Sequence, residues 1–225
     1  SPSNPTGVVY TPEEAKDIYE WVFENDIWIL SDELYEHLVY EGDPTPSPAI
    51  FDNELNNTII INGVSKAYSM TGWRVGWLIG NSKLINIAKK IQSHSVSNVS
   101  NVSQVAAEAA LKNGLNETLK MKEAFNRRRL FAIDIFTKIE LIKSNSPQGA
   151  FYIYPDVSEI IDGKVIEGVN SSYDLCNWLL EELNIAFVPG EAFGTPGFIR
   201  CSYALGDDDL QEGLSRLYDA LNKIQ

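Results

Sequence analysis

Cysteine and histidine are scarce in this sequence, with two of each among 225 residues. Cys176 and Cys201 lie in apolar stretches, YDLCNWLL and FIRCSYAL, without a CxxC pair, so we expect neither a disulfide scaffold nor a zinc site. His37 and His94 lack the spacing of metal ligands. We therefore expect that no metal ion is bound.

Positive charge is also scarce, because 18 Lys and Arg face 31 Asp and Glu, which gives a formal net charge of −13. An acidic surface repels nucleic acid and anionic lipid. No apolar run approaches the length of a membrane span. We expect partners that are neither nucleic acid nor membrane, and a cytoplasmic location.

The sequence has enough apolar residues to form a hydrophobic core. Its hydrophobic fraction is 44%, and its length allows one large or two small domains. The run YTPEEAKDIYEWVFENDI predicts a helix with Thr11 as N-cap and Pro12 at the first helical position. Apolar runs predict strands at 27–33, 58–63 and 74–80, and helices follow at 82–94, 101–113 and 116–140.

This alternation predicts an α/β first part on a largely parallel sheet, with an antiparallel third strand left open. The later pattern predicts an α+β part, with strands at 150–157, 185–190 and 197–204 and helices at 172–183 and 207–224. We place a domain boundary near residue 122, inside the long helix. The two predicted domains are 1–122 and 123–225.

Two groups of side chains are predicted to be structural. Trp21, Trp73, Trp77 and Trp178 are expected to pack in the core. The arginine triplet 127–129 is expected to form a solvated helix face, or to pair with acids of the other domain.

Three charged residues follow the ends of predicted strands, where an open α/β sheet presents its ligand crevice. Asp32 lies at the end of the run IWILSDE, and Lys66 follows TIIINGVS. The turn MTGWR then reverses the chain, so that Arg74, eight residues after Lys66, returns toward the same strand end. Each residue alone is more often structural, as a cap, a solvated lysine or half of a salt bridge. Together they offer a lysine that attacks carbonyls, an arginine for phosphate and a carboxylate for a pyridinium nitrogen. A binding site for pyridoxal phosphate requires these three groups.

Four strings occur in family order: SPSNPTG, SDELYEHLVY, SKAYSMTGWRVGW and PGEAFGTPGFIRCSYA. The sequence thereby resembles the class I aminotransferases of fold type I, which use pyridoxal 5′-phosphate, and most closely the aspartate or prephenate aminotransferase branch. The resemblance covers essentially the whole chain. It implies an incomplete large cofactor-binding domain at 1–122, mainly a parallel sheet with helices, followed by an α+β small domain at 123–225.

The resemblance assigns roles around the cofactor ring. Lys66 would be the catalytic residue, forming the Schiff base and then moving the proton between the substrate Cα and cofactor C4′. Asp32 would pair with the pyridine nitrogen. Tyr35 and Asn4 would hydrogen-bond the phenolic oxygen.

The resemblance also assigns the phosphate and substrate contacts. Ser65 and Arg74 would hold the phosphate group. Arg200, in FIRCSY, would bind the substrate α-carboxylate, and Asn4 would also face the substrate. The implied reaction is transamination between an amino acid, aspartate or a related dicarboxylic one, and a 2-oxo acid.

The sequence departs from the family in what precedes NPTG. The chain opens on SPSNPTG without an initiator methionine, so we expect it to be the later part of a longer protein. Family members carry a phosphate-binding glycine loop and a ring-stacking aromatic before NPTG and work as homodimers. This chain is therefore expected to lack a complete site. In one branch of the family, an arginine downstream of the lysine strand binds the distal carboxylate of aspartate. The corresponding stretch here, QSHSVSNVSN, has no arginine.

Two alternative functions remain open. A fold-type I lyase or synthase would share the same lysine, aspartate and arginines. A non-catalytic module would keep the fold and bind a partner through apolar surface, without capturing the cofactor.

Overall fold

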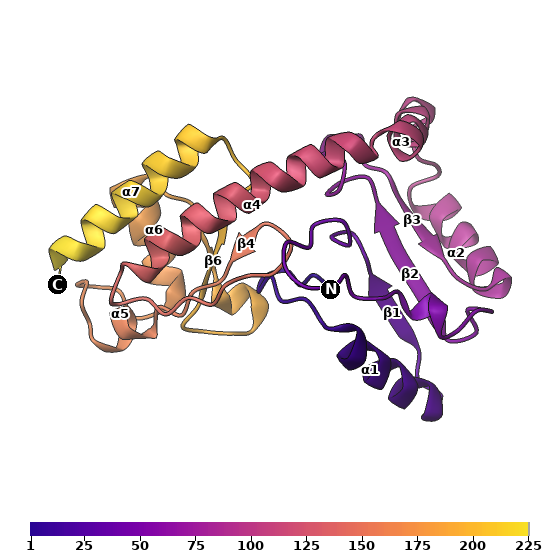
Figure 1. The fold of residues 1–225 in the computed structure, drawn as a ribbon, viewed down its shortest axis with the longest axis horizontal. Helices are drawn as coiled ribbons and strands as arrows, with labels where there is room; N and C mark the ends of the chain where they lie inside the picture. The colour runs from indigo at the N-terminus through magenta and orange to yellow at the C-terminus, as the bar shows by residue number, and fades with distance from the viewer. Residues whose placement is uncertain (225) are drawn as a thin grey trace. The chain divides into compact units, whose positions relative to one another are not determined.

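The computed structural model describes residues 1–224 and divides into two compact units. The first unit comprises Ser1–Pro2 and Val9–Lys122, and the second comprises Ser3–Val8 and the chain from Glu123 onward. The boundary falls inside helix α4 (Leu115–Thr137). Figure 1 labels helices α1 to α7 and strands β1 to β4 and β6. The assignment of 1–122 and 123–225 to a large and a small domain stays a prediction.

The first unit is built on a three-stranded sheet in the order β1-β2-β3. β1 (Ile29–Asp32) and β2 (Thr58–Gly63) are parallel, whereas β3 (Gly76–Ile79) is antiparallel to β2. The reversal that the sequence left open at the third strand is therefore present. The other elements of this unit are α1 (Pro12–Glu24), η1 (Pro48–Ile50), η2 (Thr71–Trp73), α2 (Ser82–Ser95), α3 (Asn101–Asn113) and the start of α4.

Local sequence explains where α1 begins. Thr11 Oγ1 accepts a hydrogen bond from Glu14 N, and Glu14 Oε2 accepts one from Thr11 N, which completes a capping box. Pro12 occupies the first turn, where its missing N–H costs nothing. The helix buries Ala15 and Val22.

Two of the tryptophan predictions are wrong. Trp21 is 59% exposed and Trp73 is 44% exposed. Trp21 faces away from the side of α1 that buries Ala15 and Val22, and Trp73 lies in the short helix η2, which has no buried residue. Trp77 and Trp178 are half-buried.

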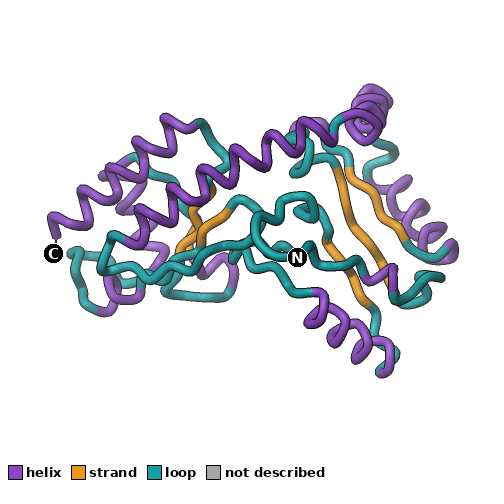
Figure 2. The backbone as a smooth tube through the Cα atoms, viewed as in Figure 1, coloured by secondary structure: helices purple, strands orange, loops and turns teal. Residues whose placement is uncertain are grey.

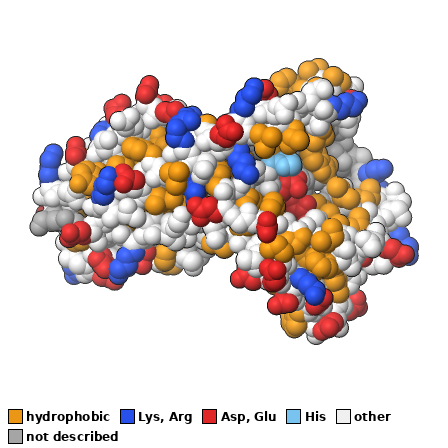
Figure 3. Space-filling model, viewed as in Figure 1, with side chains coloured by type: hydrophobic (Ala, Val, Ile, Leu, Met, Phe, Trp, Pro, Cys, Tyr) orange, Lys and Arg blue, Asp and Glu red, His pale blue; other side chains and the backbone are white. Residues whose placement is uncertain are grey.

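Helices α2 and α3 carry exposed apolar side chains. Ile87, Ile91, Val102 and Val105 are 57 to 71% exposed. Figure 3 shows hydrophobic side chains gathered on the surface in the region of α3. A surface of this kind marks an interaction region more often than an isolated exposed leucine does.

The second unit is a three-stranded antiparallel sheet with helices, in the strand order β4-β6-β5. Its strands are short, as the orange segments of Figure 2 show. Its elements after α4 are β4 (Tyr152–Ile153), α5 (Ser158–Asp162), α6 (Ser172–Leu183), β5 (Val188–Pro189), η3 (Gly190–Phe193), β6 (Ile199–Ser202) and α7 (Asp207–Ile224). Its core includes fully buried Phe136, Ile153, Leu179, Ile199 and Leu217.

The segment Ser3–Val8 belongs to the second unit because its backbone is tied to it. Gly7 O accepts hydrogen bonds of 2.9 Å from both Gln148 N and Gly149 N. Gly7 has φ +69°, and a Cβ there would lie 2.4 Å from the Pro147 side chain, so glycine is required. This contact joins residues that are far apart in sequence, which local patterns do not reveal.

The arginine triplet on α4 is only partly a solvated face. Arg127 and Arg128 both bind Asp207, at the start of α7. Arg129 is 2% exposed, which contradicts the sequence prediction for this residue. Its guanidinium donates to Pro147 O at 2.7 Å and to Asn126 Oδ1 at 2.9 Å. These acceptors offset the cost of burying the charge.

None of the helices in the described part of the chain combines the length and apolar character needed to cross a membrane. Among residues 1–224, no group of three or more His, Cys, Asp or Glu side chains is placed to hold a metal ion.

Candidate functional site

Strand register brings three of the predicted residues to one edge of the first sheet. Asp32 is aligned with Ile61, two residues before the end of parallel strand β2. Gly63, the last residue of β2, is aligned with Gly76, the first residue of antiparallel β3. Lys66 follows Gly63 by three residues and Arg74 precedes Gly76 by two. The backbones that carry an acid, an amine and a guanidinium therefore meet at the same edge.

Two glycines allow the chain to reverse tightly at this edge. A Cβ on Gly63 would lie 2.8 Å from Val75 O, and one on Gly76 would lie 3.1 Å from Asn62 O. Both distances are below ordinary van der Waals contact, so side chains there would push β2 and β3 apart. The two glycines thereby help to place Arg74 near the end of β2.

Lys66 lies in the loop that follows β2, with its side chain half-buried. Its Nζ is 5.8 Å from the centroid of the Tyr35 ring, within the range of a cation–π interaction. The neighbours Val64 and Ala67 are 0% and 3% exposed, so the loop rests on the core of the first unit. This is a lysine held at a sheet edge, unlike a lysine on a solvated surface.

Asp32 and Tyr35 lie in the segment after β1. Asp32 is exposed, and its Oδ1 accepts a 3.2 Å hydrogen bond from Leu34 N. Tyr35 is 8% exposed. The short turn between these residues thus presents a carboxylate to solvent and a ring to Lys66.

Arg74 has an unusual backbone conformation. Its φ of 57° and ψ of 45° place it in the left-handed region, at the end of η2. A non-glycine residue there is uncommon and costs conformational energy. The side chain is exposed, and one guanidinium nitrogen donates to Thr71 O at 3.1 Å. Ser65, next to Lys66, is half-buried.

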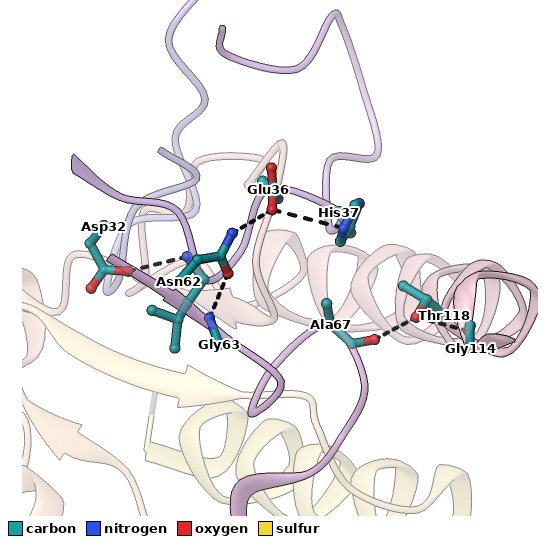
Figure 4. A network of polar contacts seen from close by, with 9 residues as sticks. Asp32, Glu36, His37, Asn62, Gly63, Ala67, Gly114 and Thr118 are labelled. Atoms are coloured by element: carbon teal, nitrogen blue, oxygen red, sulfur yellow. Dashed lines mark hydrogen bonds and ion pairs between the residues drawn. The ribbon is translucent and has the colours of Figure 1, made fainter. Parts of the chain in front are cut away.

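A second polar cluster adjoins this edge, centred on Asn62 (Figure 4). Asn62 Nδ2 donates to Glu36 Oε1, and Asn62 Oδ1 accepts a 2.7 Å hydrogen bond from Gly63 N. His37 Nε2 lies 3.8 Å from the same Glu36 oxygen. Burial raises the pKa of nearby Glu33, with a further contribution from Glu36. Asn62 was missed in the sequence, although an amide inside the apolar run TIIING was a visible signal.

Asn4 and Arg200 form a separate cluster in the second unit. Arg200, on β6, donates to Asn4 Oδ1 at 2.7 Å. Its guanidinium carbon lies 4.5 Å from the Tyr152 ring centroid and 4.9 Å from that of Phe193. These contacts orient the planar guanidinium.

The Arg200 guanidinium has donor capacity left over. Its Nε is buried and makes no hydrogen bond within the described part of the protein. An unsatisfied buried donor is costly, so such a group at a site indicates an absent acceptor. A carboxylate matches the geometry of an arginine fork.

Cys201 follows Arg200 but offers no reactive thiol. Burial raises the pKa of the Cys201 thiol to about 12. The pKa of Cys176 is likewise raised to about 12 by burial, with a contribution from Glu191. Both thiols therefore stay protonated at neutral pH.

Comparison with known proteins confirms the resemblance seen in the sequence. A family model described as aminotransferase class I and II matches residues 1–217. The chain is 48% identical to an aspartate aminotransferase of Streptomyces avermitilis, covering 100% of this chain and 56% of that protein. It is 43% identical to a probable aspartate/prephenate aminotransferase of Aquifex aeolicus, with coverage of 100% and 56%.

A solved structure shows that the likeness extends to the fold. The aspartate aminotransferase of Rhizobium meliloti superposes with a TM-score of 0.90 at 35% identity. The superposition covers 99% of this chain and 56% of that one. The chain thus spans about half the length of the relatives that it matches.

Proposed function

Because the chain belongs to the aminotransferase class I and II family, we propose that it takes part in transamination with pyridoxal 5′-phosphate. The observation that carries the proposal is the register of β1, β2 and β3, which brings Asp32, Lys66 and Arg74 to one sheet edge. The amino donor that we propose is aspartate or a related dicarboxylic amino acid, because relatives named for aspartate share 48% and 43% identity. The acceptor is a 2-oxo acid.

The residues present fit the cofactor by the chemistry of their donor set. Lys66 offers an amine for its aldehyde, Asp32 a carboxylate for its ring nitrogen, and Arg74 a guanidinium for its phosphate. Ser65 would assist Arg74 at the phosphate. Tyr35 and Asn4 would hydrogen-bond the phenolic oxygen.

When bound, pyridoxal phosphate supplies an electron sink for the electron pair left at the substrate Cα. The catalytic work of this chain falls to Lys66. Its Nζ would bind the cofactor covalently, and once released by the incoming amino acid it would take the proton from Cα. The Tyr35 ring beside Nζ limits the directions from which the amine can act.

Substrate orientation falls to Arg200 and Asn4. The Arg200 fork would bind the α-carboxylate, using the buried Nε that has no partner among residues 1–224. Asn4 already holds the other side of the guanidinium. Binding of the carboxylate would limit the orientations that the amino acid can take.

The setting of the whole protein is part of the same proposal. We expect a homodimer that acts on small molecules in the cytoplasm. The relatives are about twice as long as this chain, which covers 56% of their length.

The test is a coupled assay of the full-length protein, because this chain spans 56% of its relatives' length and is expected to lack a complete site. Aspartate and 2-oxoglutarate yield oxaloacetate, which is read through NADH oxidation by malate dehydrogenase. We expect Lys66→Ala to lower the rate by about 10³-fold or more, since the variant loses both the nucleophile and the base. The matched control is Lys83→Ala, on the exposed face of α2, with an expected change under about twofold.

Three outcomes would contradict the proposal. The first is no oxaloacetate from the wild type, and the second is equal loss in both lysine variants. The third is release of ammonia from the amino acid without an oxo-acid acceptor, which would favour the lyase or synthase alternative.

A further inference from the structure

We propose that Thr118 is a positioning residue for Lys66. Thr118 lies in the first turn of α4, and its hydroxyl donates a hydrogen bond to the carbonyl of Ala67, the residue after Lys66. The functional meaning of this contact rests on the proposed role of Lys66, whereas the contact itself is a property of the fold. Figure 4 shows Thr118, Ala67 and Gly114 together.

The hydroxyl of Thr118 has a choice of acceptors. Thr118 Oγ1 lies 2.8 Å from Ala67 O and 3.3 Å from Gly114 O. The second contact is the ordinary back-bond of a helical threonine to its own helix. A hydroxyl has one proton, so the shorter contact, across 51 residues of sequence, is the stronger hydrogen bond. Thr118 is 2% exposed, so water does not compete for this proton.

Thr118 does not act alone, because residues on the same side of the helix start hold the same loop. Gly114 packs against Tyr68, and a Cβ there would lie 3.0 Å from the Tyr68 ring. Met121 Sδ accepts a hydrogen bond from Ser69 Oγ. Thr118 and Met121 are three residues apart on one face of α4. Gly114, the residue just before α4, lies one turn earlier, and its carbonyl accepts a 3.0 Å hydrogen bond from Thr118 N. This face therefore contacts Ala67, Tyr68 and Ser69, the three residues after Lys66.

The loop itself is tightly turned. Ser69 N donates to Lys66 O at 3.3 Å, and Met70 N donates to Val64 O at 3.3 Å. Ser69 has φ 52°, in the left-handed region. The Ala67 carbonyl belongs to the peptide between Ala67 and Tyr68, so its hydrogen bond to Thr118 restrains the chain one peptide beyond Lys66. It thereby limits the movement of the tight loop that carries the lysine. The proposed reaction is faster when the Lys66 amine is held where it can reach first the cofactor aldehyde and then the Cα proton.

The first experiment compares three variants by hydrogen exchange of the backbone amides in residues 64–70. Thr118→Val keeps the shape but removes the hydroxyl, and Thr118→Ser keeps the hydroxyl. Thr137→Val is the matched control on the same helix, because Thr137 Oγ1 lies 2.9 Å from Ile133 O and 3.0 Å from Asp134 O, both within α4. We expect Thr118→Val to speed exchange about five- to tenfold, which corresponds to one lost buried hydrogen bond.

The second readout is the reactivity of Lys66 and needs no cofactor. Limiting acetic anhydride modifies lysines according to their accessibility, and peptide mass mapping compares Lys66 with exposed Lys83. We expect Lys66 to react more slowly than Lys83 in the wild type. We expect Thr118→Val to raise the relative rate of Lys66 about five- to tenfold, Thr118→Ser to restore it, and Thr137→Val to leave it unchanged.

The outcomes separate this inference from the proposed function. Unchanged Lys66 reactivity and unchanged loop exchange in Thr118→Val would overturn the positioning role, whatever Lys66 does. Equal effects of Thr118→Val and Thr137→Val would reduce the role to general helix stability and overturn it too. If Thr118→Val frees Lys66 but pyridoxal phosphate never modifies Lys66, the contact stands and the proposed function fails.

Discussion

Arg127, Arg128 and Arg129 are neighbours in sequence with three different environments. Arg127 has a side chain 63% exposed and Arg128 one 21% exposed, and they share the carboxylate of Asp207. These two guanidinium groups hold the pKa of Asp207 below its usual value through hydrogen bonds. Arg129 instead enters the core and supports the turn at Pro147. A run of like charges therefore says little about any single member.

Replacing the buried member of the triplet should cost much more than replacing an exposed one. Arg129→Met leaves Pro147 O without its charged donor, and we expect a loss of about 2 to 4 kcal/mol in the free energy of unfolding. Arg127→Met removes half of a solvated pair and should cost less than about 1 kcal/mol. Urea unfolding of both variants measures the difference. Equal losses would mean that Arg129 is not a structural residue.

Some candidate site residues can be predicted from the sequence, whereas others cannot. Asp32, Lys66 and Arg74 are visible because each stands at the edge of an apolar, β-rich run. Thr118 is hidden because its acceptor lies 51 residues earlier. Trp21 and Trp73 were predicted to be buried but are exposed. Aromatic character alone does not tell which face of a helix is buried.

Elements with strong local signals begin and end where the sequence predicts. Strand β2 occupies 58–63, helix α6 occupies 172–183 and helix α7 occupies 207–224, as predicted. The strands at 150–157 and 185–190 are shorter, at Tyr152–Ile153 and Val188–Pro189. β4 pairs with Cys201 and Ser202 of β6, and β5 pairs with Ile199 and Arg200, so each of the two strands meets a different half of β6. Pairing length is a tertiary property that a single strand's sequence does not contain.

The capping box of α1 stabilises the start of this helix. Thr11→Ala removes the acceptor of Glu14 N and should cost about 1 kcal/mol. Thr11→Ser keeps the capping oxygen, so its free energy of unfolding should stay within about a few tenths of a kcal/mol of the wild-type value. Thermal unfolding, with amide exchange at the start of α1, measures both. A Thr11→Ala variant as stable as the wild type would show that the helix start is set by other contacts.

The whole molecule consists of two units, each with its own sheet and core. The α/β and α+β character of its two parts could be predicted, because strand and helix patterns alternate early and segregate later. The grouping of Ser3–Val8 with the second unit could not, because it depends on the contact between Gly7 and the turn at Gln148 and Gly149.

The central claim for the whole molecule is that Lys66 is the amine that captures pyridoxal phosphate. The most direct test is incubation with the cofactor, reduction with borohydride and peptide mass mapping, on the full-length wild type and on its Lys66→Ala variant. We expect more adduct at Lys66 than at the exposed Lys83 and Lys89, and none in the corresponding peptide of the variant. Equal labelling of exposed lysines, or none at Lys66, would contradict it and favour a non-catalytic binding module.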